Sequence, residues 1–214
     1  MNINLSRAVA QFFPNPSLQM VYFEAVANAI DAGASNIAIA IRIESFQKPK
    51  TLEVSITDDG EGFNDNNFNK FSTLLETESE SHKGLGRLVY LSYFNEVDVE
   101  STFENKKRSF VFYDKFEKDA VETLDANGKE GTSLLFKGYR KKVKTYDYLS
   151  PKALKRDIEL HFFPTLYAKK ISGEDLNINI TLETLDEKPE YGFVNGTESI
   201  SLDTIPELKK KTFI

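Results

Sequence analysis

Apolar and polar residues along the chain repeat with two different periods, which predict a mixture of helices and strands. Residues 17–32 carry apolar side chains at helical spacing, with Pro16 just before them and Gly33 just after them, as is typical of the two ends of a helix. Residues 35–45 and 52–57 instead alternate between apolar and polar, which predicts two strands joined by a turn.

The rest of the chain continues this mixture. Helical patterns cover residues 65–76, 87–94 and 150–170, the last with a break near Pro164. Residues rich in β-branched and aromatic side chains predict further strands at 96–102, 108–116, 132–139 and 176–184. The pattern as a whole favours an α+β fold, but it does not indicate the order of the strands.

The length of the chain suits one domain. Its 214 residues, of which 40% are hydrophobic, suffice for a domain with a sizeable core and an appendage. We therefore expect one domain over residues 1–185. Residues 186–214 are turn-rich and predict a linker or the start of a further module. The last six residues form no recognisable ending, so we expect the chain to be part of a longer protein.

Composition narrows the class of protein. The net charge of −6 gives no overall basic field that would attract nucleic acid or an anionic membrane, although a local patch remains possible. The absence of cysteine excludes disulfides, thiolate metal ligands and cysteine nucleophiles, and it suits a reducing compartment. No signal peptide and no run approaching the roughly 20 apolar residues of a membrane span is present, so we predict a soluble, cytoplasmic protein without a membrane partner.

The first predicted helix carries an unusual polar stripe. In the segment EAVANAIDAGA at 24–34, Glu24, Asn28 and Asp31 are separated by four and three residues, which places all three on one face. This face is either the solvated side of an amphipathic helix or a row of polar groups aimed at a ligand.

Three later segments bear on this choice. DDGEGF at 58–63 and KGLGR at 83–87 are rich in glycine, and Gly131 and Thr132 begin a predicted strand. Each segment alone is compatible with an ordinary turn, so their order and separation carry the information.

In this order the four segments resemble the boxes of the GHKL ATPase superfamily, which contains gyrase, MutL mismatch-repair proteins, MORC proteins, the ninety-kilodalton heat-shock chaperones and the sensor histidine kinases. The resemblance covers roughly residues 15–140. It implies the Bergerat ATP-binding fold, a two-layer α+β sandwich with a mixed, mostly antiparallel sheet and helices on one face. The nucleotide would lie between the helices, beneath a lid at about 64–83.

The resemblance implies ATP and Mg²⁺ as ligands and gives the polar stripe a role. Asn28 would bind Mg²⁺ through its amide oxygen, which is a suitable hard ligand that adds no negative charge. Glu24, one helical turn earlier, would act as general base for an attacking water molecule. Asp31 would support these groups through hydrogen bonds.

The resemblance also assigns the adenine end of the site. Asp58 would accept a hydrogen bond from the adenine amino group, with Thr132 alongside, and Gly60 and Gly62 would let the backbone approach the base and sugar. Asp59 stands where the family often has asparagine, and we assign it no direct role.

The glycine box at 83–87 would bind phosphates. Backbone N–H groups at Gly84, Leu85 and Gly86 precede a predicted helix and can point at phosphate oxygens. Lys83 and Arg87 flank this turn, either as phosphate contacts or as solvated surface charges. His82, in the polar run TESESHK, fits the surface of a lid that nucleotide orders better than it fits catalysis.

Within the superfamily, Glu24 favours hydrolysis. Histidine kinases generally lack a glutamate four residues before the asparagine, whereas the branch with gyrase, MutL and MORC has one. We therefore predict a Mg²⁺-dependent ATPase that works as a nucleotide-gated dimerising clamp or switch within a larger protein. It would turn over slowly by itself, as a monomer until ATP drives homodimerisation.

Three alternatives remain at this stage. The first is an ATP-binding regulatory module that gates a downstream nucleic-acid-acting effector and hydrolyses little ATP. The second is a histidine-kinase-type phosphotransferase, and the third is a chaperone-like clamp for protein clients. The basic run KGYRKKVK at 137–144 is either a nucleic-acid contact in line with the first alternative or a solvated loop.

Overall fold

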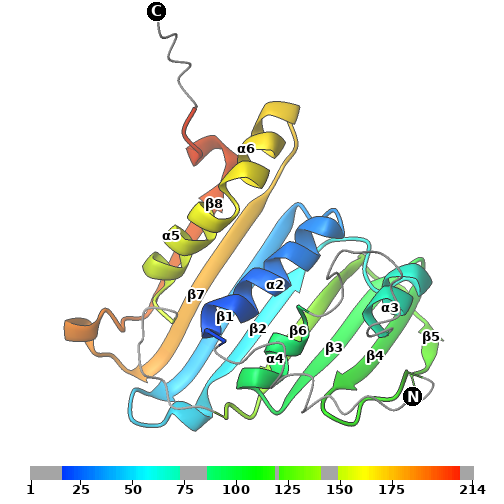
Figure 1. Ribbon diagram of the computed structural model, residues 1–214, viewed down its shortest axis with the longest axis horizontal. Helices are drawn as coiled ribbons and strands as arrows, with labels where there is room; N and C mark the ends of the chain where they lie inside the picture. Colours follow the sequence, from blue (N-terminus) through cyan, green and yellow to red (C-terminus); the bar gives the residue numbers. More distant parts are fainter. Residues whose placement is uncertain (1–15, 73–85, 119–120, 141–148, 208–214) are drawn as a thin grey trace, which may run out of the picture.

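The structure of the protein, a computed structural model, describes residues 16–72, 86–118, 121–140 and 149–207 (Figure 1). Its helices are α2 (Leu18–Asp31), α3 (Asp65–Ser72), α4 (Leu88–Tyr93), α5 (Pro151–His161) and α6 (Phe163–Ser172). Its strands are β1 (Asn36–Ser45), β2 (Glu53–Asp58), β3 (Glu96–Phe103), β4 (Lys106–Phe112), β5 (Thr123–Asp125), β6 (Gly131–Lys137), β7 (Asn177–Asp186) and β8 (Gly196–Ser201). Within these ranges, three single-turn 3-10 helices lie at Pro49–Thr51, Pro189–Tyr191 and Leu202–Thr204.

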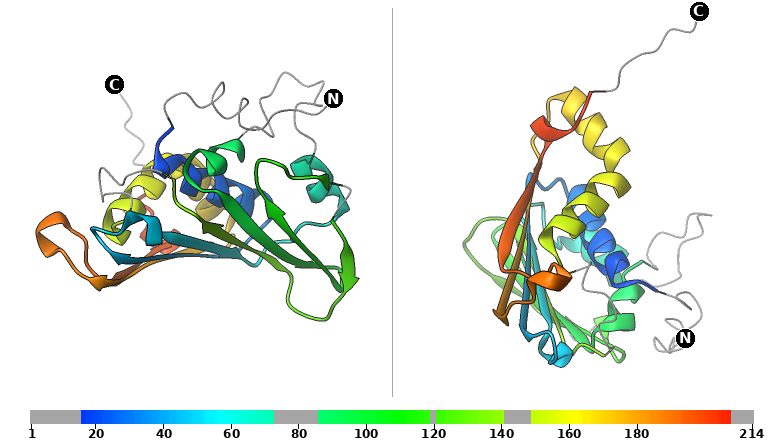
Figure 2. Two further views of the ribbon diagram at one scale, coloured as in Figure 1. Left: turned by 90° about the horizontal axis from the view of Figure 1, so that it is seen from below. Right: turned by 90° about the vertical axis from the view of Figure 1, so that its left-hand side faces the viewer.

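The described strands form one eight-stranded sheet in the order β5-β4-β3-β6-β2-β1-β7-β8. β1 and β7 run parallel, and every other neighbouring pair in this sheet is antiparallel. The helices cover one face of the sheet (Figure 2). The predicted class, a two-layer α+β sandwich with a mixed and mostly antiparallel sheet, is therefore confirmed.

The core lies between the helices and the covered face of the sheet. In β1 the isoleucines 37, 39, 41 and 43 alternate inward and are buried, which explains the alternation seen in the sequence. From the helical side, Val21, Tyr22 and Val26 of α2 are completely buried against this face. Each large apolar side chain buried in this way contributes about 1.5–3 kcal/mol, so α2 is firmly fixed while its polar stripe points elsewhere.

Several boundaries follow from local chemistry. Gly33 adopts a left-handed conformation with φ of +74° just after α2 ends, as its place in the sequence predicts. The predicted break near Pro164 separates α5 from α6, and this proline lies in the first turn of α6. Glu104 and Asn105 both have positive φ and form the two-residue turn between β3 and β4.

Two strands are absent from the sequence prediction. β5 is exposed along its length and, among the described strands, pairs with β4 alone. β8 pairs with β7 although it lies in the turn-rich segment after residue 185. The division of the chain at 185 stays a prediction, but β8 belongs to the same sheet as the preceding strands. None of the helices in the described ranges has both the length and the apolar character needed to cross a bilayer.

Candidate functional site

The polar stripe of α2 lies beside α4. Glu24 is half-buried, whereas Asn28 and Asp31 are exposed. The amide nitrogen of Asn28 donates to Oε1 of Glu24 at 3.2 Å and to the Tyr90 hydroxyl at 3.3 Å. Both bonds use the nitrogen of the amide, so the amide oxygen remains available to a cation.

The surroundings of Glu24 tune its basicity. Burial raises the pKa of Glu24, while the hydrogen bond from Asn28 and the positive charge of Arg87 oppose this rise. The nearby charge of Asp31 raises the pKa further. A carboxylate with a raised pKa is a stronger base than an ordinary glutamate, which suits proton transfer near neutral pH.

The described end of the glycine box packs against Glu24. A Cβ atom on Gly86 would collide with both carboxylate oxygens of Glu24, so only glycine allows this approach. Arg87 follows as a buried residue and is not a solvated surface charge. Its guanidinium lies 4.7 Å from the centre of the Phe71 ring and donates to the Lys70 carbonyl at 3.3 Å. Burial lowers the pKa of Arg87 to about 10, where it is still charged at neutral pH.

Asp58 lies at the end of β2, on the other side of the site. The Gly60 N–H donates to its Oδ1 at 2.9 Å, and the backbone of Thr132, its direct neighbour on β6, donates to the same carboxylate. Burial nevertheless raises the pKa of Asp58 to about 6. This half-buried carboxylate holds backbone donors on one side and can accept a further donor from a ligand.

Close backbone contacts explain the glycines around Asp58. A Cβ atom on Gly60 would lie 2.8 Å from the Ala32 carbonyl oxygen, and one on Gly131 would collide with the carbonyl of Asp58. Gly62 has φ of +70°, and a Cβ there would lie 2.6 Å from the hydroxyl of Ser101. The glycines thus bring the end of α2, the 58–63 loop and the start of β6 together.

Ser101 on β3 completes this end of the site, and Tyr90 completes the other. The hydroxyl of Ser101 accepts the Phe63 N–H at 2.7 Å, donates to the Gly131 carbonyl at 3.1 Å and lies 3.4 Å from Oγ1 of Thr132. Sequence reasoning missed both residues. A signal existed for Ser101, because it continues the inward positions of Val97 and Val99; Tyr90, in an apolar helix, offered none.

Asp59, to which the sequence assigned no direct role, is a structural residue. Its carboxylate accepts the backbone N–H groups of Ser35 and Asn36 at 2.8 and 2.7 Å and the side-chain amide of Asn36 at 2.7 Å. It therefore ties the 58–63 loop to the start of β1.

Some predicted residues lie outside the described ranges. These are Lys83, Gly84 and Leu85 of the glycine box, His82, the part of the expected lid after Ser72, and residues 141–144 of the basic run. In the described part of that run, Lys137 pairs with Asp98 at 2.7 Å, and Arg140 donates to Asn95 at 2.6 Å. These two cations therefore have partners within the chain.

The donor set fits a magnesium ion that takes few protein ligands. Among the described residues no group of three or more His, Cys, Asp or Glu side chains could by itself hold a metal ion. The oriented amide oxygen of Asn28 offers one hard ligand at an exposed position, and Mg²⁺ commonly combines one or two protein oxygens with phosphate oxygens and water. The residues present therefore fit a cation that arrives with phosphates.

Comparison with known protein families decides the identity of this arrangement. The family model described as "Histidine kinase-, DNA gyrase B-, and HSP90-like ATPase" matches residues 16–135, more than half of the chain. The chain belongs to this family. The match includes the polar stripe of α2, the 58–63 loop, the glycine box and Thr132, so the GHKL ATPase resemblance seen in the sequence is confirmed.

Solved structures agree at the level of the fold. The crystal structure of the N-terminal domain of a DNA repair protein matches 93% of this chain with a TM-score of 0.56 and 14% sequence identity. This chain spans 56% of the length of that structure. Comparison with curated proteins gives no match. Members of the GHKL ATPase family bind ATP, and the described site is the part of the fold where its boxes meet.

Proposed function

We propose that this GHKL domain binds ATP together with Mg²⁺, hydrolyses it slowly, and serves as a nucleotide-gated switch in a larger protein. The observation that carries the proposal is the position of Glu24. Its carboxylate is half-buried, accepts a hydrogen bond from the amide nitrogen of Asn28 at 3.2 Å and lies against Gly86 of the glycine box. In this proposal Glu24 is the base, Asn28 is the ligand for a cation and Gly86 is part of a phosphate-binding turn, and the three lie together.

The adenine end of the proposed site is Asp58. Two backbone donors hold its carboxylate, and a remaining lone pair accepts the amino group of adenine. A base without a donor at that position would leave a half-buried acceptor without a partner, which typically costs about 1–3 kcal/mol. Selectivity for adenine follows from this cost.

The chemistry proposed at the other end is attack of water on the terminal phosphorus. Glu24 accepts a proton from the water as the new oxygen–phosphorus bond forms, the bond to ADP breaks, and its electron pair leaves with the ADP oxygen. Bound Mg²⁺ supplies positive charge that stabilises the phosphates. Asn28 would hold that ion through its amide oxygen, and Gly86 leaves room for the carboxylate of Glu24.

Glu24 also supports hydrolysis over phosphotransfer. A kinase of this family must keep water from competing with its acceptor histidine, whereas a half-buried carboxylate of raised pKa beside the phosphate end promotes the attack of water. The proposal therefore ranks hydrolase above phosphotransferase.

Two substitutions test the proposal together. Glu24→Gln should retain ATP binding and lower turnover by about 10²–10⁴-fold, because only the base is lost. Asp58→Asn should lose adenine nucleotide binding, because the carboxylate acceptor becomes an amide. The exposed Glu53→Gln and Asp114→Asn are matched controls. Normal ATP binding by Asp58→Asn would refute the site assignment, and normal turnover by Glu24→Gln would refute the assigned base.

The proposal also includes a clamp, in which ATP binding brings two copies of the domain together. Its support is family membership, and sedimentation with and without a non-hydrolysable ATP analogue tests it; we expect a monomer without nucleotide and a dimer with it. A nucleic-acid partner gains little support from the basic run, because Lys137 and Arg140 are engaged within the chain. A salt-dependent DNA-binding assay on the longest available protein tests that partner.

A further inference from the structure

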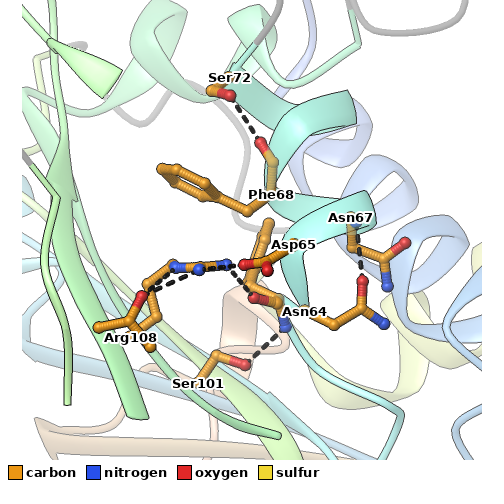
Figure 3. A network of polar contacts seen from close by, with 9 residues as sticks. Asn64, Asp65, Asn67, Phe68, Ser72, Ser101 and Arg108 are labelled. Carbon is orange, nitrogen blue, oxygen red and sulfur yellow. Dashed lines mark hydrogen bonds and ion pairs between the residues drawn. The ribbon is translucent and has the colours of Figure 1, made fainter. Parts of the chain in front are cut away.

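Arg108 of β4 is a buried residue at the centre of a polar network that the proposed mechanism does not use (Figure 3). The residue is only 5% exposed. Its guanidinium donates to the Phe63 carbonyl at 2.5 Å, to Oδ1 of Asp65 at 2.7 Å and to the Thr123 hydroxyl at 2.9 and 3.1 Å. It also lies between the rings of Phe68 and Phe103, at 4.4 and 4.9 Å from their centres.

These contacts hold the backbone at the junction between the 58–63 loop, called the adenine loop below because it follows Asp58, and helix α3. Ser101 accepts the N–H of Phe63 at 2.7 Å, and Arg108 binds the carbonyl of the same residue. One residue later, Asn64 caps α3 through a 2.9 Å bond from the Asn67 N–H, and then Asp65 pairs with Arg108. Phe63 is therefore a fixed point, with the adenine loop before it and α3 after it.

The sheet register links this fixed point to Asp58. Asp58 pairs with Thr132, Thr132 with Ser101, and Ser101 with Arg108, across the neighbouring strands β2, β6, β3 and β4. A single cross-strand row thus runs from the proposed adenine acceptor to the guanidinium that holds α3.

A second buried arginine holds the other end of α3. Arg87 donates to the Lys70 carbonyl and stacks on Phe71, whereas Arg108 pairs with Asp65 and stacks on Phe68. Arg87 directly follows Gly86 of the glycine box. α3 therefore bridges the adenine end and the phosphate end of the site, with a charged residue at each anchor.

From this geometry, and resting on the proposed function, we propose that Arg108 is a positioning residue for ATP. It sets α3 relative to the cross-strand row from Asp58, so that the far end of α3 meets Arg87 beside Gly86 and keeps the phosphate end of the proposed site in register with the adenine end. Without Arg108 the adenine pocket persists, but the extra affinity that a third phosphate confers is lost.

A purely structural role for Arg108 would instead predict an equal loss of affinity for all three ligands in the test below, so the variant must be one that still folds. A buried ion pair is weak evidence for stability, and apolar replacements of similar volume are often tolerated. The partner here, Asp65, has a side chain that is 80% exposed, so it stays solvated when Arg108 is removed. Phe68, Phe103 and their aromatic neighbours would accommodate a methionine.

The experiment measures dissociation constants of adenosine, ADP and a non-hydrolysable ATP analogue. In Arg108→Met the preference for the analogue over ADP should fall by about tenfold or more, since displaced supporting groups typically cost 10–100-fold, while adenosine affinity stays within about twofold. Arg108→Lys, which keeps the charge but loses the planar fork, should restore the preference only in part. Lys107→Met, on the same strand in an exposed pair with Glu100, is the matched control and should behave as the parent.

Asp65→Asn keeps the proposal testable if Arg108→Met does not fold. It should lower the preference for the analogue in the same direction, with the exposed Asp125→Asn as its control. An unchanged preference in either test variant overturns the inference, as does an equal loss of affinity for all three ligands. If the parent binds all three ligands and Asp58→Asn binds none, either of these results refutes only the role of Arg108 and leaves the proposed function standing. A parent that binds no adenine nucleotide refutes the proposed function, and this inference with it.

Discussion

Gly86 lies directly against the carboxylate of Glu24, and no side chain fits between them. A Cβ atom at Gly86 would collide with Oε1, Oε2 and Cδ of Glu24. The glycine box and the stripe on α2 are 62 positions apart in the sequence, yet they form one surface at the proposed base.

Gly86→Ala should therefore inactivate the domain without unfolding it. The atoms that the new methyl group displaces belong to the flexible end of Glu24, so the carboxylate moves and stability changes by less than about 1 kcal/mol. Turnover should fall by about 10²–10⁴-fold, as in the loss of a general base. Gly128→Ala is the control, because its Cβ would meet Thr102 at an ordinary 3.7 Å. Normal turnover by Gly86→Ala would contradict the role of Glu24.

The hydroxyl of Tyr90 orients the proposed magnesium ligand. Burial raises the pKa of Tyr90 well above its ordinary value, so the hydroxyl is protonated at neutral pH. It accepts a hydrogen bond from the amide nitrogen of Asn28 at 3.3 Å. Tyr90→Phe should raise the Mg²⁺ concentration needed for half-maximal turnover by about tenfold, within the range that supporting groups of metal sites show. Tyr93→Phe, on the same helix, removes instead a bond to the Pro16 carbonyl. We expect this control to leave the Mg²⁺ requirement unchanged; an equal shift in both variants would argue against the orienting role.

The sequence predicted those elements whose own residues carry a clear hydrophobic pattern or a characteristic end residue. The inward isoleucines of β1 alternate because one face of the strand is buried, and Gly33 ends α2 because its positive φ suits glycine. β5 carries no such pattern, since it is exposed and exists only through pairing with β4. β8 buries a single isoleucine, Ile200, so its pairing with β7 outweighs a local preference for turns.

The same distinction holds for the site. Glu24 and Asn28 share a helix, and their spacing in the sequence already places them on one face. Tyr90 and Arg108 reach the site from distant segments, through helix packing and strand register respectively. No short-range pattern contains this information, which is why the sequence indicated the chemistry of the site and not the residues that position it.

Asp58 makes the stability of the domain depend on pH. Its pKa rises from 3.8 to about 6 on folding, mainly through burial, so the folded chain binds more protons between these values than the unfolded chain. The stabilisation is complete below pH 3.8 and is lost as the pH rises through 6. Asp58→Asn removes this loss. The stability of the variant relative to the parent should thus increase by about 1–3 kcal/mol between pH 4 and pH 7.5, allowing for partial exposure of the carboxylate.

Urea denaturation of parent and Asp58→Asn at the two pH values measures this difference. The exposed Asp114→Asn serves as the control and should differ from the parent equally at both. The variant predicted to lose ATP binding would thus gain stability relative to the parent toward neutral pH, as expected when a functional carboxylate is kept in a partly buried place. A constant difference between Asp58→Asn and parent would contradict the raised pKa.

Ser101 supports the adenine loop from beneath. Ser101 is 2% exposed, and its hydroxyl satisfies both the N–H of Phe63 and the carbonyl of Gly131. Ser101→Ala leaves two partly buried polar groups without this partner, so the free energy of unfolding should fall by about 1–3 kcal/mol. Affinity for adenosine should fall as well, because the loop and Thr132 lose a common support, whereas Arg108→Met should spare adenosine. Ser109→Ala, exposed on β4, should change stability by less than about 0.5 kcal/mol. If Ser101→Ala binds adenosine as tightly as the parent, the cross-strand row does not support the adenine pocket.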